Sequence, residues 1–104
     1  MGITELKLPE MIQYREHQIA SKSLTRKLGI ELPFMVYAMD AGESISNEQS
    51  TLTRLLQVID GILTVQVGTV RYQVPAGEMM VVPANTLHEL RADQRCQFMQ
   101  FETK

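Results

Sequence analysis

The chain has 104 residues, of which 44% are hydrophobic and 21% charged, and its formal net charge at pH 7 is −2. A chain of this length has room for one hydrophobic core, and its small negative charge does not favour non-specific binding to nucleic acid. No apolar run is long enough to cross a bilayer, and the N-terminal residues lack the apolar stretch of a signal peptide. The single cysteine, Cys96, fits a reducing compartment. We therefore expect a cytoplasmic protein with no nucleic-acid or membrane partner.

Residues 1–16 are predicted to form an N-terminal segment outside the main fold. Within it, residues 9–16 could form a short helical turn, because Pro9 suits the first turn of a helix. From residue 17 to residue 104, turn residues separate short apolar stretches about every eight to twelve positions, which is typical of an antiparallel sandwich or barrel. The expected strands cover residues 18–24, 34–40, 51–60, 61–67, 70–74, 78–83, 87–92 and 96–102.

Residues 62–74 are predicted to form a hairpin with a two-residue turn at Gly68 and Thr69. Glycine at the first central position is typical of a type II′ turn. With this turn, one face of the hairpin is apolar and the other is mostly polar, so the register is well specified. The apolar cross-strand pairs are then Val67 with Val70, Val65 with Tyr72, and Leu63 with Val74.

The expected strand at residues 52–59 carries large apolar side chains on both of its faces. Alternation therefore leaves two possibilities. Arg54 points into the core, or the register is shifted by one residue, so that Leu55 points into the core and Arg54 points to solvent. A strand that is apolar on both sides usually has both sides covered. Because the chain has no room for a second domain, we expect a second subunit to cover the outer face in a homodimer.

Glycine, proline and histidine recur at a familiar spacing in the second half of the chain. Gly42 and Gly61 lie at the two ends of a segment that has the length of the first cupin motif. Gly77, Pro83 and His88 match the second cupin motif in step.

Asn85 stands where the second glycine of that motif usually lies. This is a mild departure, because asparagine is the non-glycine residue that best tolerates a positive φ. Residues 42–92 therefore resemble the cupins, and in particular the small single-domain conserved-barrel (cupin 2) proteins. The resemblance implies an all-β, antiparallel jelly-roll barrel over residues 17–104.

The resemblance also implies four metal-ligand positions, of which one carries a histidine here. These positions fall on Glu48, Ser50, Arg54 and His88, where cupins have two histidines, a glutamate and a histidine. A unit charge about 5 Å from a divalent ion contributes roughly 6–7 kcal/mol at an effective dielectric near 20, so repulsion by Arg54 offsets attraction by Glu48. One imidazole is too little for tight retention of a metal. We expect no tightly held metal or other cofactor.

Three interpretations of Glu48, Arg54 and His88 remain open if they meet in one barrel mouth. Arg54 and Glu48 could form a structural ion pair capped by His88, because an unpaired buried charge is costly. Arg54 could instead hold the carboxylate or phosphate of a small ligand, which guanidinium geometry suits. In the third interpretation, His88 and Glu48 form an acid/base pair.

The leading hypothesis is a metal-poor cupin that binds a small molecule, with an anion as one candidate, at Glu48, Ser50, Arg54 and His88. One alternative is a metal-dependent oxygenase, isomerase or lyase that uses His88 and Glu48. Another is a dimeric interaction protein without ligand chemistry. The fold does not select among them, because cupin barrels host enzymes, storage proteins and sensors alike.

Overall fold

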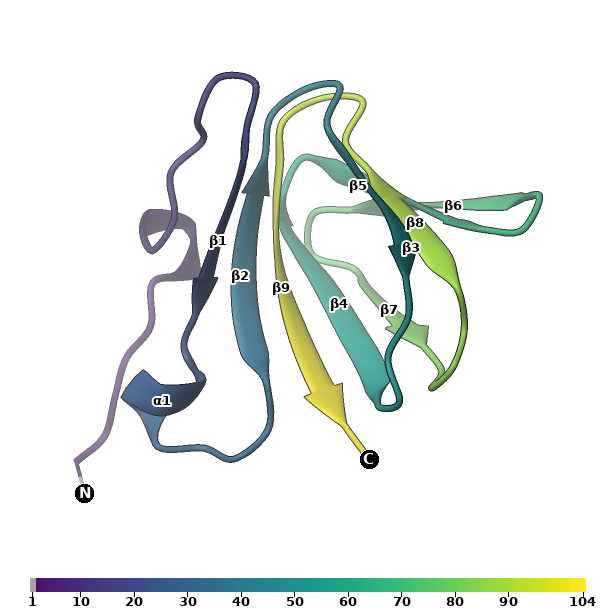
Figure 1. Cartoon of the computed structure of the whole chain (residues 1–104). Coiled ribbons are helices and arrows are strands. Elements are labelled where there is room, and N and C mark those ends of the chain that lie inside the picture. Colours follow the sequence, from purple (N-terminus) through teal and green to yellow (C-terminus); the bar gives the residue numbers. More distant parts are fainter. Residues whose placement is uncertain (1) are drawn as a thin grey trace.

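The computed structural model describes residues 2–104, within which nine strands form two antiparallel sheets (Figure 1). Two short helical turns, η1 (Leu8–Glu10) and α1 (Thr25–Leu28), accompany them. Neither turn is long or apolar enough to span a membrane. The strands are β1 (Ile19–Ser23), β2 (Phe34–Met39), β3 (Ser44–Glu48), β4 (Thr53–Asp60), β5 (Ile62–Val67), β6 (Val70–Pro75), β7 (Met79–Val82), β8 (His88–Arg91) and β9 (Cys96–Thr103).

The two sheets face each other across the core. The five-stranded sheet has the order β1-β2-β9-β4-β7, and the four-stranded sheet has the order β3-β8-β5-β6. Most neighbours within a sheet are therefore distant in the chain, with the C-terminal strand β9 lying between β2 and β4. This arrangement confirms the predicted all-β antiparallel barrel. The side chains that fill the core include Met39, Leu56, Val58, Leu63, Val65, Leu90 and Phe98.

The β5–β6 hairpin has the predicted register and turn. Val67 pairs with Val70, and Leu63 pairs with Val74. Gly68 has a φ of 61°, as the first central position of a type II′ turn requires. The apolar face of the hairpin extends beyond the core, so that Val70 is 49% exposed at the tip, which projects to the right in Figure 1.

The direction of Arg54, which alternation left open, is inward. In β4 the side chains of Arg54, Leu56 and Val58 are buried, whereas Leu55 and Gln57 are partly exposed on the outer face. The guanidinium therefore enters the space between the sheets, and apolar residues lie outside.

The N-terminal segment packs onto the outer face of the five-stranded sheet. Its helical turn is the 3₁₀ turn η1 rather than a turn over residues 9–16. Ile12 is 7% exposed and packs with Val36 and Ala38 of β2. The turn η1 also contacts β4, so the chain itself provides part of the cover that we expected from a second subunit.

Asp40 and Arg95 attach this segment to the barrel. Arg95 Nε donates a hydrogen bond to Asp40 Oδ1 at 2.9 Å, and the backbone N–H of His17 donates to Asp40 Oδ2 at 2.6 Å. The Arg95 guanidinium also lies 5.2 Å from the centre of the Tyr14 ring. These contacts, led by the hydrogen bond from Arg95, lower the pKa of Asp40 to about 2.

The low pKa of Asp40 predicts a specific loss of stability in acid. Its ordinary pKa is 3.8, so the stabilising contribution is complete above about pH 4 and is lost as the pH falls toward 2. We expect Asp40→Asn to lower the melting temperature at pH 6 and to have much less effect at pH 2.5, as measured by circular dichroism. The exposed Asp93→Asn is the matched control. A deficit in Asp40→Asn that is equal at both pH values would contradict this linkage.

Candidate functional site

Four side chains from four strands meet inside one end of the barrel, and we refer to Glu48, Arg54, His88 and Glu102 as the Arg54 cluster. Arg54 Nε donates to Glu102 Oε1 at 2.6 Å, and Nη1 donates to Glu48 Oε1 at 3.2 Å. The same Nη1 lies 3.3 Å from His88 Nε2. Arg54 is therefore the centre of the cluster, and each of the other three contacts it.

Cross-strand pairing places the cluster, with two residues from each sheet. Arg54 of β4 pairs with Glu102 of β9, and Glu48 of β3 pairs with His88 of β8. The strand β3 was not among the strands expected from the sequence, because its segment SISNE has a single apolar residue, Ile45.

The direction of Glu48 depends on an irregularity in β3. The register shifts between Ile45 and Glu48, and Asn47 has a φ of 55°. In a regular strand, alternation would place residue 48 on the face opposite to Ile45, which packs against the core. The bulge reverses this alternation and brings the Glu48 carboxylate to the inner face.

His88 is 3% exposed, and its hydrogen bonds define its tautomer. Nδ1 lies 2.8 Å from the carbonyl oxygen of Thr86, which can only accept, so Nδ1 carries the proton. Nε2 faces Arg54 Nη1, which can only donate, so Nε2 presents its lone pair and the imidazole is neutral. Among residues 2–104, Arg54 rather than Glu48 is the side-chain partner of His88, so this geometry does not form the acid/base pair considered from the sequence.

The turn before His88 has the conformation predicted from the motif. Asn85 has a φ of 62°, and its backbone N–H donates to the carbonyl oxygen of Ser50 at 2.7 Å. The Ser50 hydroxyl accepts a hydrogen bond from the backbone N–H of Leu52 at 3.0 Å. Ser50 thus shapes the loop before β4, and its hydroxyl is bonded there rather than to the Arg54 cluster.

Sequence reasoning did not identify Glu102 and Gln100, which lie on the inner face of β9. Gln100 is 4% exposed and pairs with Met35 and Leu56 of the adjacent strands. Its Oε1 has no hydrogen-bond partner among residues 2–104. Leaving such a group unsatisfied costs about 1–3 kcal/mol, and most buried polar groups are paired. The polar residues that recur in QFMQFE were the sequence signal for polar side chains inside the barrel. Because both faces of β9 are covered, periodicity did not show which of these residues point inward.

Tyr37 of β2 lies beside the Arg54 cluster. Its ring stacks on Phe98, with centroids 4.8 Å apart and an interplanar angle of 12°. Burial raises the pKa of the Tyr37 phenol, and the negative charge of Glu48 raises it further. The phenol is therefore neutral at pH 7 and can donate or accept a hydrogen bond inside the barrel.

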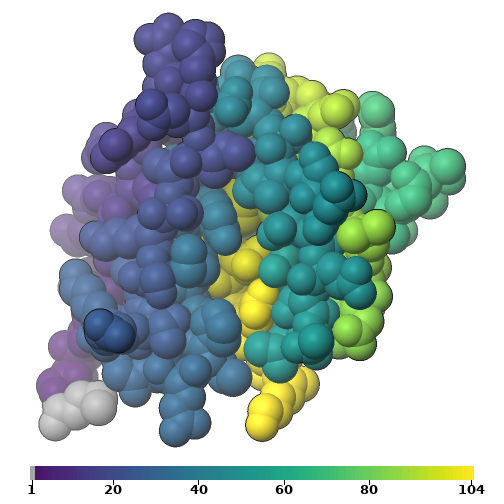
Figure 2. Space-filling model, in the orientation of Figure 1, coloured from purple at the N-terminus to yellow at the C-terminus, as the bar shows by residue number. Residues whose placement is uncertain are grey.

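The cluster is unequally open to solvent. The side chains of Arg54 and Glu102 are 11% and 12% exposed, whereas that of Glu48 is 30% exposed. In Figure 2, atoms of β9 (yellow) are visible at the surface between those of β2 (blue) and β3 (teal). Glu48 is the member of the cluster that an entering molecule meets most readily.

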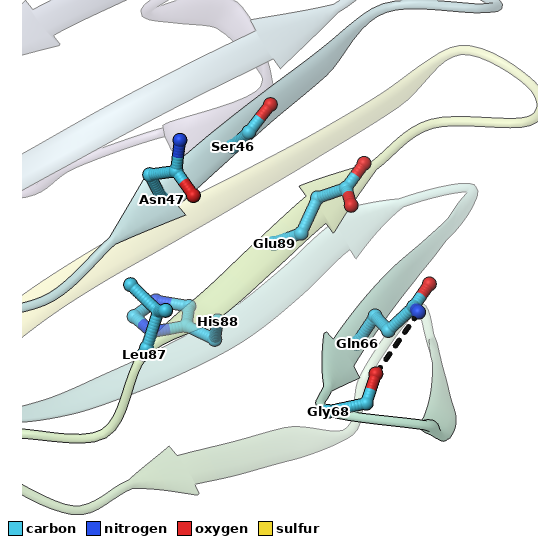
Figure 3. Close-up of a pocket in the computed structure, with 7 residues that line it drawn as sticks. All are labelled: Ser46, Asn47, Gln66, Gly68, Leu87, His88 and Glu89. Carbon is cyan, nitrogen blue, oxygen red and sulfur yellow. Dashed lines mark hydrogen bonds between the residues drawn. The ribbon is translucent and has the colours of Figure 1, made fainter.

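A separate shallow pocket of about 150 Å³ lies on the outer face of the four-stranded sheet (Figure 3). Gln66 lines this pocket, and Gln66 Nε2 donates a hydrogen bond to the Gly68 carbonyl oxygen at 3.1 Å. The pocket reaches His88, but the Nε2 of that imidazole is directed to Arg54 inside the barrel. The pocket and the Arg54 cluster therefore share His88 but lie on opposite faces of the four-stranded sheet. Its lining residues are Ser46, Asn47, Gln66, Gly68, Leu87, His88 and Glu89.

The fold and the polar cluster together define the structural class of this protein. It is an antiparallel jelly-roll barrel that holds charged residues at one end. No protein-family sequence model and no curated protein matches the chain. Solved structures do match it. A conserved protein of unknown function from Streptococcus pyogenes is 21% identical, with a TM-score of 0.86, over 100% of this chain and 90% of that one.

Two further neighbours specify the class. A cupin superfamily protein from Desulfitobacterium hafniense is 19% identical, with a TM-score of 0.84, over 98% of this chain and 92% of that one. A cupin 2 conserved barrel domain protein from Leptotrichia buccalis is 27% identical, with a TM-score of 0.86, over 95% of this chain and 47% of that one. The chain has the cupin fold and is cupin 2-like, as the motif spacing predicted.

The cupin fold implies a divalent metal, but the residues in this barrel do not fit one. The acceptor atoms of Glu48, His88 and Glu102 that converge inside the barrel are directed at the Arg54 guanidinium. Among residues 2–104, no group of three or more His, Cys, Asp or Glu side chains is arranged to hold a metal ion. A metal at this point would have to displace a fixed positive charge.

Proposed function

We propose that this cupin barrel binds a small polar molecule at the end that contains the Arg54 cluster, and that binding needs no tightly held metal. The observation that carries the proposal is the unpaired Oε1 of Gln100, buried beside the cluster. A buried ion pair costs desolvation and is a weak source of stability, and an unpaired amide adds to that cost. A ligand that completes these hydrogen bonds offsets the cost.

Within residues 2–104, two members of the cluster have hydrogen-bonding positions that are not used. The contacts within the cluster use Nε and Nη1 of Arg54, which leaves the Nη2 donors for a ligand. The contact of Glu48 uses Oε1, which leaves Oε2 as an acceptor. Together with the Tyr37 hydroxyl, these groups suit a molecule that carries both donors and acceptors. The anionic ligand predicted from the sequence is one form of this proposal, in which a carboxylate accepts from Nη2.

The test is a nuclear magnetic resonance screen of isotopically labelled protein against small acids, amines, amides and sugars, with and without a chelator. We expect at least one compound to shift the signals of Tyr37, Glu48 and Gln100 together, with no effect of the chelator. Ligand-induced shifts that require added nickel, zinc, iron or manganese would favour the metal-dependent enzyme that uses His88 and Glu48. A barrel interior that no compound perturbs would rule out the binding function.

We also propose that the chain forms a homodimer through β7, on the basis of how its sheet edges are protected. Charged residues discourage association at an exposed sheet edge. The edge strands β1, β3 and β6 contain Lys22, Glu48 and Arg71, respectively, whereas β7 has no charged residue. Met79 and Val81 of β7 are 50% and 55% exposed. A second copy that pairs with this edge covers both its backbone groups and these side chains.

This proposal predicts that a charge on β7 separates the subunits. We expect wild-type protein to be dimeric at micromolar concentration in analytical ultracentrifugation, and Val81→Glu to be monomeric with an unchanged circular dichroism spectrum. Val70→Glu, which changes an exposed valine at the tip of the other sheet, is the matched control and is expected to stay dimeric. A monomeric wild type, or a dimer that withstands Val81→Glu, would exclude this interface.

A further inference from the structure

We infer that the molecule bound in the barrel is a small organic cation, specifically a compound with a primary ammonium group. This inference rests on the proposed binding function and specifies its ligand. It reverses the sign of charge that Arg54 alone suggested, and it follows from the residues that surround Arg54 in the folded protein.

The charges of the Arg54 cluster do not cancel. Glu48 and Glu102 each contact Arg54, and His88 is neutral in its hydrogen-bonding arrangement. With both carboxylates ionised, two negative charges face one positive charge, which leaves a net charge of −1. A unit charge about 5 Å away, at an effective dielectric near 20, changes affinity by on the order of a hundredfold, in favour of a cation and against an anion.

The unpaired groups nearest to this net charge include two acceptors. Glu48 Oε2 belongs to the most exposed charged side chain of the cluster, which is 30% exposed. Gln100 Oε1 lies on the inner face of the opposite sheet, is more deeply buried, and has no partner among residues 2–104. An ammonium group carries three N–H donors and no acceptor, so it can donate to such oxygens without adding an unpaired acceptor of its own.

An anion at this site would leave more hydrogen-bonding groups and more charge unpaired than a cation would. It would accept hydrogen bonds from Arg54 Nη2, but it would leave Gln100 Oε1 unsatisfied and would raise the net charge of the interior from −1 to −2. A cation reduces that charge to zero and satisfies Gln100. Glu48 is also more exposed than Arg54 and Glu102, so the charged group that an entering ligand meets first is a carboxylate.

The experiment compares three probes of nearly equal size: n-propylammonium chloride, propionamide and sodium propionate. Each is titrated at pH 7 and constant ionic strength into labelled wild-type protein, with sodium chloride as the blank. We expect n-propylammonium to give saturable shifts at Tyr37, Glu48 and Gln100, and to bind more tightly than the other two. Glu48→Gln is expected to weaken this binding by at least about tenfold, as the loss of a hydrogen bond to a charged group implies.

Two further variants keep the result interpretable. Glu89→Gln, on the outer face of β8, removes a carboxylate that pairs with Arg91 and is expected to leave n-propylammonium binding unchanged. Gln100→Leu removes the unpaired amide, so we expect a higher melting temperature together with weaker n-propylammonium binding. This variant serves as the test if Glu48→Gln does not fold.

The outcomes separate this inference from the proposed function. Saturable binding of propionate or propionamide inside the barrel, without binding of n-propylammonium, overturns the ammonium ligand and leaves a binding function in place. Binding of n-propylammonium that is equal in wild type, Glu48→Gln and Gln100→Leu also overturns it. If none of the three probes and none of the compounds in the wider screen shifts these signals, the binding function fails with it.

Discussion

Replacing Arg54 with methionine is expected to lower the free energy of unfolding by about 3–5 kcal/mol, the usual cost of removing one partner from a buried ion pair. Methionine keeps much of the aliphatic length of the side chain and removes the charge. Glu102, whose side chain is 12% exposed, then loses its hydrogen bond from Nε, and Glu48 loses the one from Nη1. In a chain of this size the loss corresponds to a fall in melting temperature of more than about 10 °C.

The triple variant Arg54→Met, Glu48→Gln, Glu102→Gln is the control for this prediction. It removes all three charges, and we expect it to recover much of the stability, since the cost arises from unpaired carboxylates rather than from lost packing. The measurement is urea unfolding monitored by circular dichroism. If Arg54→Met is as stable as the wild type, or if the triple variant is no more stable than the single one, the Arg54 cluster is not the buried network that the distances describe.

Gly61→Ala has the second largest expected effect. Gly61 connects β4 of one sheet to β5 of the other and has a φ of 76°. A Cβ at this position would lie 2.3 Å from the carbonyl oxygen of Arg95 and 3.2 Å from Cys96 Cα. Both are backbone atoms, so the chain itself must shift. Left-handed backbone strain costs about 1–3 kcal/mol for a non-glycine residue, and the steric conflict adds to it, so we expect a loss of at least about 3 kcal/mol.

Gly42→Ala is the matched control, because it separates strain from steric conflict. Gly42 has a φ of 87°, but, apart from its two chain neighbours, no atom of residues 2–104 lies within 4 Å of its Cβ position. We therefore expect Gly42→Ala to cost about 1–2 kcal/mol, the left-handed backbone strain alone. Both variants are compared by thermal and urea unfolding. Equal losses at the two positions would show that the approach of the Arg95 carbonyl has no energetic consequence.

The candidate site was only partly predictable from the sequence. The motif spacing identified His88 and Arg54 as positions of interest, and the structure places both in one cluster with Glu48. Glu102 was missed, although its carboxylate makes the shortest contact of Arg54, at 2.6 Å. No motif connects residues 54 and 102, which become neighbours only because β4 and β9 pair. Ser50 also falls on a metal-ligand position of the cupin motif, but its hydroxyl accepts a hydrogen bond from the loop backbone.

Local chemistry determined those features that the sequence alone predicted correctly. The turn at Gly68 fixes the register of the β5–β6 hairpin, and the tolerance of asparagine for a positive φ accounts for the turn at Asn85. The spacing of glycines and proline was enough to indicate the cupin barrel. The turns at Gly68 and Asn85 depend on the conformational preferences of residues that are close together in the chain, whereas the motif spacing was informative through its resemblance to a known family.

Only the tertiary structure decided the charge of the barrel interior. Strand alternation left the direction of Arg54 open, and the bulge that turns Glu48 inward has no reliable sequence signature. Pairing of distant strands then added a second carboxylate and an unpaired amide on the same inner face. The sign of the charge that a ligand meets depends on the sum of these groups, and that sum exists only once both sheets have formed.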